Sequence, residues 1–228
     1  MTSDDDLLRF PVRAPKGAGS AYLVRPGDDG AGRGHGVLVL HSWWGLNRAV
    51  KDFCNRLCDE GFVVLAPDLF GGRCPATAHE AQQALDDMDP NAAANLVLSS
   101  AVALRSASDD PSGPISVVGF SMGASLALWA AARQPESFDR VVIYYGTSSL
   151  DFSAMTARVL GHFVDDDVMV SDDDVTLLSA ELFEAGSEPV LWHYPDAVHW
   201  FAEPGEHGCY DEAAAELAWQ RTLDFLKN

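Results

Sequence analysis

The sequence predicts an α/β protein in which a mostly parallel, doubly wound sheet carries helices on both faces. Short apolar runs alternate along the chain with longer stretches of helical periodicity, and this alternation is typical of a parallel sheet covered on both faces. The 228 residues are 47% hydrophobic, which is enough for one sizeable core. No break in composition divides them, so we expect a single domain over residues 1–228, with residues 1–19 as a peripheral N-terminal segment.

The predicted elements follow one another in a regular order. Continuous apolar runs predict strands at 37–40, 62–66, 115–118, 140–145, 157–164 and 189–194. Helical periodicity predicts helices at 47–60, 76–88, 90–107, 125–134, 172–186 and 211–226. Local signals support several helix ends. Asn47 and Ser171 are placed to cap helices, Gly61 to end one, and Asp89-Pro90 to separate two.

The segment Gly119-Phe120-Ser121-Met122-Gly123 stands between a predicted strand and a predicted helix. Gly-x-Ser-x-Gly in that context is typical of the nucleophile elbow of an α/β-hydrolase. The turn forces the serine into a strained conformation, and Cβ atoms at Gly119 and Gly123 would collide where strand and helix pass closely. An ordinary turn with Ser121 as a helix cap is the alternative.

Two further residues complete a catalytic triad in the chain order expected for this fold. A serine hydroxyl needs a base, and the base needs an orienting acid. Asp167 follows the strand at 157–164, and His199 follows the strand at 189–194, which gives the order serine, acid, histidine. Because the carboxyl ends of parallel strands meet at one edge of a sheet, we expect the three to lie together. Asp166, the neighbour of Asp167, is the alternative acid.

The oxyanion of an acyl-transfer intermediate needs two donors. One is the backbone N–H of the residue after the nucleophile, Met122, and the other comes from the loop after the strand at 37–40, where Trp43 is the natural candidate. Aromatic residues near the strand ends are candidates for an apolar substrate pocket, although such residues also serve as core. They are Trp44, Phe70, Trp200 and Phe201.

Composition excludes several other functions. The formal net charge is −19, from 34 acidic residues against 15 Lys and Arg, so the chain should repel nucleic acids and anionic membranes. No stretch is long enough to span a bilayer, and the start of the chain is acidic rather than signal-like. The cysteines and histidines lack paired metal-ligand spacing. We therefore expect free thiols, no metal, no cofactor and a cytoplasmic location.

From about Gly34 to the C-terminus the chain resembles the dienelactone hydrolase family. The residues that carry the resemblance lie at 40–47, 61–71, 160–163, 194–201 and 220–226. The resemblance implies an α/β-hydrolase fold. It also assigns Ser121 to the nucleophile position, Asp167 to the acid, His199 to the base, and Trp43 and Met122 to the oxyanion positions.

Three positions depart from the family members that cleave dienelactone. Those members carry a cysteine nucleophile, a glutamate directly after the strand, and a basic residue a few positions after the histidine. This chain has Ser121, Ser42 and Glu203 there. A carboxylate can manage the proton of a thiol but not that of a much less acidic hydroxyl, so Ser121 must rely on His199. We expect Ser42 and Glu203 to line the pocket, and Glu203 to oppose an anionic substrate.

These observations favour a serine hydrolase that cleaves small neutral carboxylic esters or lactones through an acyl-enzyme, as a monomer or homodimer. Two alternatives stay open. One is a carboxymethylenebutenolidase acting on an anionic lactone, with Arg73 in the Gly-rich loop as the basic residue. The other is a catalytically silent ligand-binding domain, against which the intact order of Ser121, Asp167 and His199 argues.

Overall fold

The structure is a computed structural model that describes residues 7–11, 18–27, 33–205 and 207–228. The chain forms two compact units, Met1–Ile115 and Ser116–Asn228. Strand β5 (Ile115–Phe120) begins at the division between them.

The described residues of the first unit form four strands, in the order β1-β2-β4-β3. They are β1 (Leu7–Pro11), β2 (Ala18–Val24), β3 (Gly36–Leu40) and β4 (Val63–Pro67). β3 and β4 are parallel, with Gly36 opposite Val63, whereas β2 is antiparallel to both β1 and β4. Every residue of β3 and β4 is buried, as expected for strands covered on both faces.

The part of this unit that the structure describes also contains the helices α1 (Arg48–Asp59), α2 (Ala78–Asp86) and α3 (Pro90–Ala107). α1 packs against β4 and β2, and α3 packs against β3 and β4. The predicted caps are present, because the side chain of Asn47 accepts from Val50 N at 3.1 Å and that of Asp89 accepts from Asn91 N at 2.9 Å. The helices predicted at 47–60, 76–88 and 90–107 are therefore present, and α2 is two residues shorter at each end than predicted.

Strands β1 and β2 were not predicted, since the sequence analysis assigns no element before Val37. The β2 segment has small residues at its start and no clear alternation, so its pairing with β4, not its own pattern, makes it a strand. Tyr22 anchors it by donating its hydroxyl hydrogen to Asn55 Oδ1 of α1 at 2.8 Å. Of the peripheral segment expected at residues 1–19, residues 1–6 and 12–17 lie outside the described residues, and β1 lies at the edge of the strand order.

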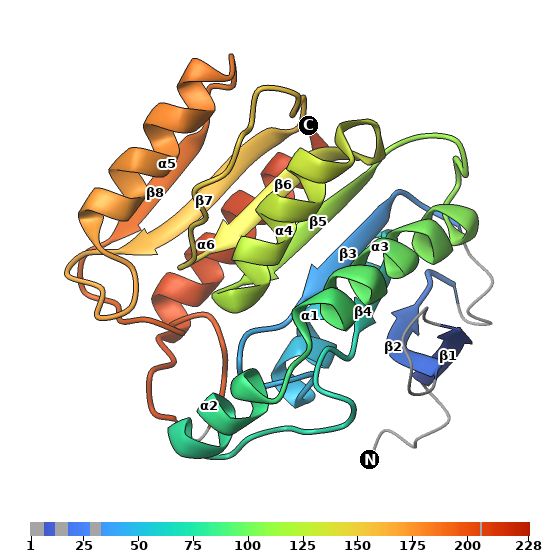
Figure 1. Cartoon of the computed structure of the whole chain (residues 1–228), viewed down its shortest axis with the longest axis horizontal. Coiled ribbons are helices and arrows are strands. Elements are labelled where there is room, and N and C mark those ends of the chain that lie inside the picture. Colours follow the sequence, from blue (N-terminus) through green and yellow to red (C-terminus); the bar gives the residue numbers. More distant parts are fainter. Residues whose placement is uncertain (1–6, 12–17, 28–32, 206) are drawn as a thin grey trace. The chain divides into compact units, whose positions relative to one another are not determined.

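The second unit contains β5, β6 (Phe138–Tyr144), β7 (Arg158–Val164) and β8 (Val190–Tyr194), in that order. β7 is parallel to both β6 and β8. The helices of the second unit are α4 (Met122–Arg133), α5 (Asp172–Glu184) and α6 (Glu212–Lys227). α4 lies in front of the strands in Figure 1 and α6 lies behind them. The parallel pairs and the helices on opposite faces confirm the predicted α/β class.

A buried histidine ties three elements of this unit together. His162 of β7 shares hydrogen bonds with the hydroxyl groups of Tyr194 on β8 and Thr222 on α6, each at 2.9 Å. Burial, and secondly the positive charge of Arg221, lower the pKa of His162 to about 3. The imidazole is therefore neutral and serves as a structural hydrogen-bonding group.

This depressed pKa makes the stability of the protein depend on pH. Between about pH 6.5 and about pH 3 the unfolded chain binds a proton at His162 and the native chain does not, so the free energy of unfolding falls as the pH falls, by about 1.4 kcal/mol per unit. From about pH 7.5 to about pH 5 we expect the wild type to lose about 2 kcal/mol more than His162→Gln in urea unfolding. His79→Gln makes the same substitution at an exposed histidine and is the matched control variant. Equal slopes for wild type and His162→Gln would contradict the prediction.

Candidate active site

Ser121 lies on a strained turn between β5 and α4. Its backbone angles are φ 50° and ψ −113°, a region that a residue with a side chain seldom adopts. A Cβ atom at Gly119 would come within 2.2 Å of the carbonyl oxygen of Gly123, so only glycine permits this approach of strand and helix. The predicted strand-turn-helix is thus present, with Ser121 at its apex.

His199 and Asp167 extend from Ser121 as a continuous hydrogen-bonded chain. Ser121 Oγ lies 2.9 Å from His199 Nε2, and His199 Nδ1 lies 2.9 and 2.8 Å from the two carboxylate oxygens of Asp167. The side chains of both His199 and Asp167 are 2% exposed. With a carboxylate at Nδ1, the neutral imidazole keeps its hydrogen there, and Nε2 is left to accept the hydroxyl hydrogen of Ser121.

The three adjacent aspartates after β7 have different surroundings. Asp167 Oδ1 accepts from Met169 N at 2.8 Å as well as facing His199. Asp165 instead pairs with His193 on β8 at 3.1 Å, at the surface. Asp166 is exposed and has a φ of 51°. The structure therefore brings Asp167, and not Asp166, to His199.

The residues after the ends of β5, β6, β7 and β8 share an unusual backbone feature. Among the described residues, four that are not glycine have a positive φ, namely Ser121, Tyr145, Asp166 and Trp200. One is the serine of the elbow, two are direct neighbours of Asp167 and His199, and the fourth packs its ring on His199 at 4.9 Å. Such conformations cost about 1–3 kcal/mol each and persist only where the surroundings enforce them, which is typical of functional sites.

The loop after β3, in the first unit, carries Trp43. The ring of His41 holds this loop through both nitrogens: Nδ1 lies 2.6 Å from the carbonyl oxygen of Ser42, and Nε2 accepts from Leu69 N at 3.1 Å. Gly45 N donates to the same Ser42 oxygen at 3.2 Å. In a planar trans peptide the N–H points opposite to the C=O, so holding the Ser42 carbonyl also fixes the direction of the Trp43 N–H.

The state of His41 suits that structural task. Burial lowers its pKa despite the neighbouring Ser42 carbonyl and Asp68, so the ring is neutral, donates from Nδ1 and accepts at Nε2. Sequence reasoning did not single out His41, and its position directly after a strand was the available signal.

Of the two expected oxyanion donors, Met122 is the first residue of α4, where helix N–H groups have no acceptor within the helix. Trp43 belongs to the first unit and Met122 to the second. Their joint action on one oxyanion stays a prediction.

Most residues expected to line a substrate pocket are buried. Ser42, Trp44 and Phe70 are 0–6% exposed in the first unit, as are Phe201 and Glu203 in the second. Phe201 packs against the rings of Tyr145 and Tyr194. Trp200 is partly exposed and meets the ring of His199 edge-on at 4.5 Å.

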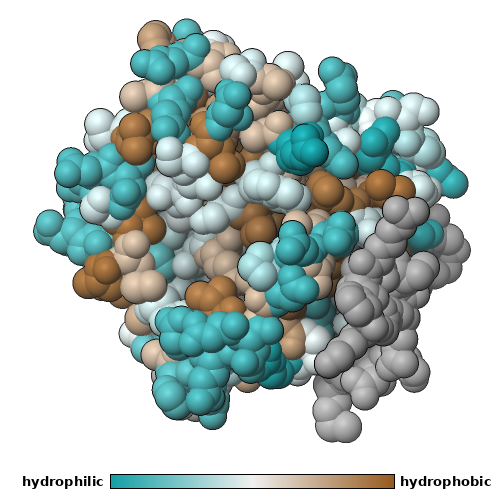
Figure 2. Space-filling model, in the orientation of Figure 1, coloured by the Kyte–Doolittle hydropathy of each residue, from teal (hydrophilic) through white to brown (hydrophobic). Residues whose placement is uncertain are grey.

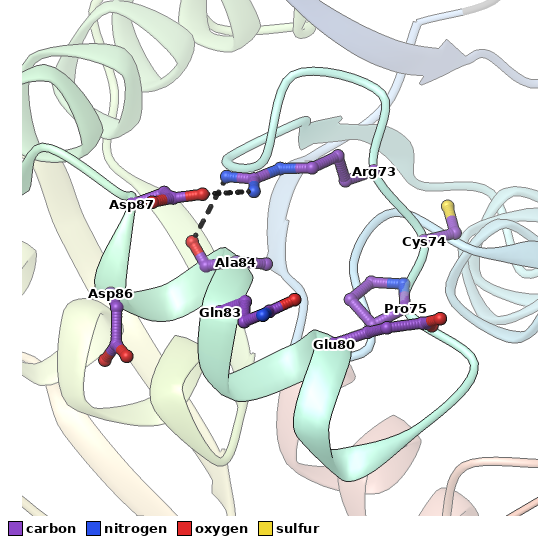
Figure 3. Close-up of a pocket in the computed structure, with 8 residues that line it drawn as sticks. All are labelled: Arg73, Cys74, Pro75, Glu80, Gln83, Ala84, Asp86 and Asp87. Atoms are coloured by element: carbon purple, nitrogen blue, oxygen red, sulfur yellow. Dashed lines mark hydrogen bonds and ion pairs between the residues drawn. The ribbon is translucent and has the colours of Figure 1, made fainter.

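Arg73 lines a cavity of about 580 Å³ beside α2, shown in Figure 3. Its guanidinium forms an ion pair with Asp87 at 2.9 Å and donates to the carbonyl oxygen of Ala84 at 3.3 Å. Glu80 and Asp86 also line this cavity. The basic residue considered for binding a substrate carboxylate is therefore already engaged by a carboxylate of the protein.

The described residues also bear on membrane-spanning helices and metal sites. Among them no helix has the length and hydropathy needed to cross a bilayer. Figure 2 shows apolar residues interspersed with hydrophilic ones on the face in view. Within the same ranges no three His, Cys, Asp or Glu side chains gather as metal ligands would.

The sequence is similar to proteins of a known family. The sequence model of the Dienelactone hydrolase family matches residues 20–228. A carboxymethylenebutenolidase from Pseudomonas putida is 29% identical over 206 residues, which cover 83% of this chain and 84% of that protein. Protein usf from Aquifex pyrophilus is 27% identical over 203 residues, covering 85% and 88%.

A solved structure described as a dienelactone hydrolase-like promiscuous phosphotriesterase from metagenomic libraries has the same fold. It superposes with a TM-score of 0.80 at 22% identity and covers 97% of each chain. The fold thus places the protein in the class of α/β-hydrolases. Because the family match takes in most of the sequence, the chain belongs to the dienelactone hydrolase family, and it is a hydrolase of ester or lactone bonds.

Proposed function

We propose that the protein is a serine hydrolase that cleaves small uncharged carboxylic esters or lactones. In this proposal Ser121 is the nucleophile, His199 the general base and Asp167 the orienting acid, while the N–H groups of Met122 and Trp43 bind the oxyanion. The observation that carries the proposal is the unbroken chain of hydrogen bonds from Ser121 through His199 to Asp167, each at 2.9 Å or less.

The chemistry follows from those contacts. His199 Nε2 takes the hydroxyl proton as Ser121 Oγ attacks the carbonyl carbon, and the imidazolium that forms is stabilised by Asp167. Charge that develops on the carbonyl oxygen is bound by backbone N–H groups, one of them at the positive end of α4. His199 then gives its proton to the leaving alcohol. A water molecule, activated by the same imidazole, hydrolyses the acyl-enzyme and frees Ser121.

The relative from Pseudomonas putida bears the name of a second candidate activity, that of a carboxymethylenebutenolidase. An anionic lactone would require a cation at the site. Arg73 is paired with Asp87, and the net charge of −19 opposes an anion at long range. We therefore favour uncharged substrates.

We also propose that residues 1–228 form one domain and that the protein works in the cytoplasm. The family match supports the first point, because it runs through both units. Four cysteines without a disulfide are compatible with the second. Light scattering after size exclusion would distinguish a monomer from a homodimer.

A fluorophosphonate probe tests the nucleophile. We expect it to modify Ser121 covalently, because a base-activated serine attacks phosphorus as it attacks a carbonyl carbon. Ser121→Ala should lose both the label and the esterase activity. Ser125→Ala is a matched control on the next turn of α4, where Ser125 Oγ donates to the Thr147 carbonyl, and it should keep both. A label at another residue would contradict the assignment of Ser121, and no label on folded protein would favour a silent ligand-binding domain.

Substitution of the neighbouring aspartates tests the acid. Asp167→Asn should lower kcat by about 10³- to 10⁴-fold, because an amide neither holds the imidazole in the required tautomer nor stabilises its positive charge. Asp165→Asn should change kcat by less than about threefold, since Asp165 faces His193 at the surface. A steady-state assay on one neutral ester compares the two variants. The assignment fails if Asp165→Asn is the more damaging change.

Selectivity for charge can be measured with two esters that differ only in a free carboxylate. We expect kcat/KM to favour the uncharged ester by about 10- to 100-fold, from an opposed interaction of about 1–3 kcal/mol. The ratio should shrink between about 20 mM and about 500 mM salt, because the acidic surface acts through solvent. Arg73→Gln should leave the ratio unchanged. A wild-type preference for the carboxylate-bearing ester would move the butenolidase activity to first place.

A further inference from the structure

Glu203 is a charged residue in an unusual place. It is 3% exposed, and carboxylates are seldom buried to this extent unless a polar partner compensates for lost water. The hydroxyl of Tyr145 supplies that partner by donating its hydrogen to Glu203 Oε1 at 2.8 Å. The carboxylate therefore faces a phenol of the protein interior.

Tyr145 is the first residue after β6 and is fully buried. Its φ of 39° is rare for a bulky residue, and its N–H donates to the carbonyl oxygen of His162 at 2.7 Å. The next residue, Gly146, passes so close to the elbow that a Cβ there would lie 2.4 Å from the carbonyl oxygen of Ser121. The Tyr145-Gly146 turn thus supports the backbone of Ser121, while the Tyr145 ring packs on His199.

Glu203 stands at the other end of the loop that carries His199. Two backbone hydrogen bonds of 3.0 Å form turns in this loop. One runs from Phe201 N to the Val198 oxygen, and the other from Glu203 N to the Trp200 oxygen. Trp200 between them has a φ of 67°. A loop with a strained residue needs an anchor, and the contact with Tyr145 anchors this one to the turn beneath Ser121.

We propose that Glu203 and Tyr145 are positioning residues, and that their buried hydrogen bond holds the His199 loop in register with the Ser121 elbow. The inference rests on the proposed function and deepens it. Glu203 acts in this view through Tyr145 and His199, and does not act by repelling the charge of a substrate. Burial, and then the charge of Glu203, raise the pKa of Tyr145 well above its usual value, so the phenol remains a hydrogen donor at any pH of an assay.

The variants Tyr145→Phe and Glu203→Leu remove either end of this bond. A displacement of about 1 Å at a reacting group can cost about 100-fold in rate, so we expect each variant to lower kcat on a neutral ester by about 10- to 100-fold, with KM changed less than about threefold. Glu203→Gln keeps an acceptor oxygen and should recover most of the loss. The double variant Tyr145→Phe/Glu203→Leu should be no slower than the slower single variant, because both changes break one interaction.

Tyr144→Phe is the matched control. Tyr144 is also a buried tyrosine, but its hydroxyl shares a 2.7 Å hydrogen bond with Thr222 on α6. Its loss should lower the free energy of unfolding, measured in urea, about as much as Tyr145→Phe does, without the fall in kcat.

Three outcomes would overturn the inference: Tyr145→Phe with wild-type kcat, Tyr144→Phe with an equal loss of kcat, or Glu203→Gln with a changed ratio of neutral to anionic substrate. Ser121→Ala separates these results from a failure of the proposed function. If Ser121→Ala is inactive and Tyr145→Phe is not impaired, only the positioning role is wrong. If Ser121→Ala keeps its activity, the proposed function is wrong as well.

Discussion

The strained turn at Ser121 is the constraint on which the rest of the second unit depends. A serine whose backbone is held at φ 50° would relax to a commoner conformation unless the strand before it and the helix after it were both fixed. The missing Cβ of Gly119 lets α4 approach β5, and the bond from Ser121 N to the Tyr144 oxygen ties the turn to β6. The energy for this strain comes from burial of the surrounding strands and of the inner face of α4.

Burial also strengthens the interaction between Asp167 and His199. Asp167 and His199 are almost entirely removed from solvent, so the attraction between a carboxylate and an imidazolium is much stronger there than at the surface. The pair of Asp165 and His193, which has the same chemical groups in water, gains little by comparison. Asp165 and Asp167 follow the same strand, β7, and they differ in what they can do because Asp167 faces a buried histidine and Asp165 faces a histidine at the surface.

Much of this arrangement was predictable from the sequence, because it follows from local rules. Caps such as Asn47 and Ser171 and the apolar runs of β3 to β8 depend on neighbouring residues, and the chain order of Ser121, Asp167 and His199 follows from the fold. Strands β1 and β2 were missed because strand pairing creates them: β2 pairs with β4, and β1 pairs with β2. The contact between Tyr145 and Glu203 joins residues that are 58 positions apart, and no local pattern reports such a distance.

The hydrogen bonds of His41 with Ser42 and Leu69 affect how the loop after β3 can vary in sequence. The group it orients is a main-chain N–H, and the orientation is imposed through the carbonyl of Ser42. The contacts that hold this carbonyl come from the ring of His41 and the N–H of Gly45. If the N–H of residue 43 binds an oxyanion, as proposed, then the residue there can change in size or polarity while the donor stays in place. Evolution, or a designer building a library at this position, can therefore vary what the loop presents to a ligand separately from the electrostatics of the reaction.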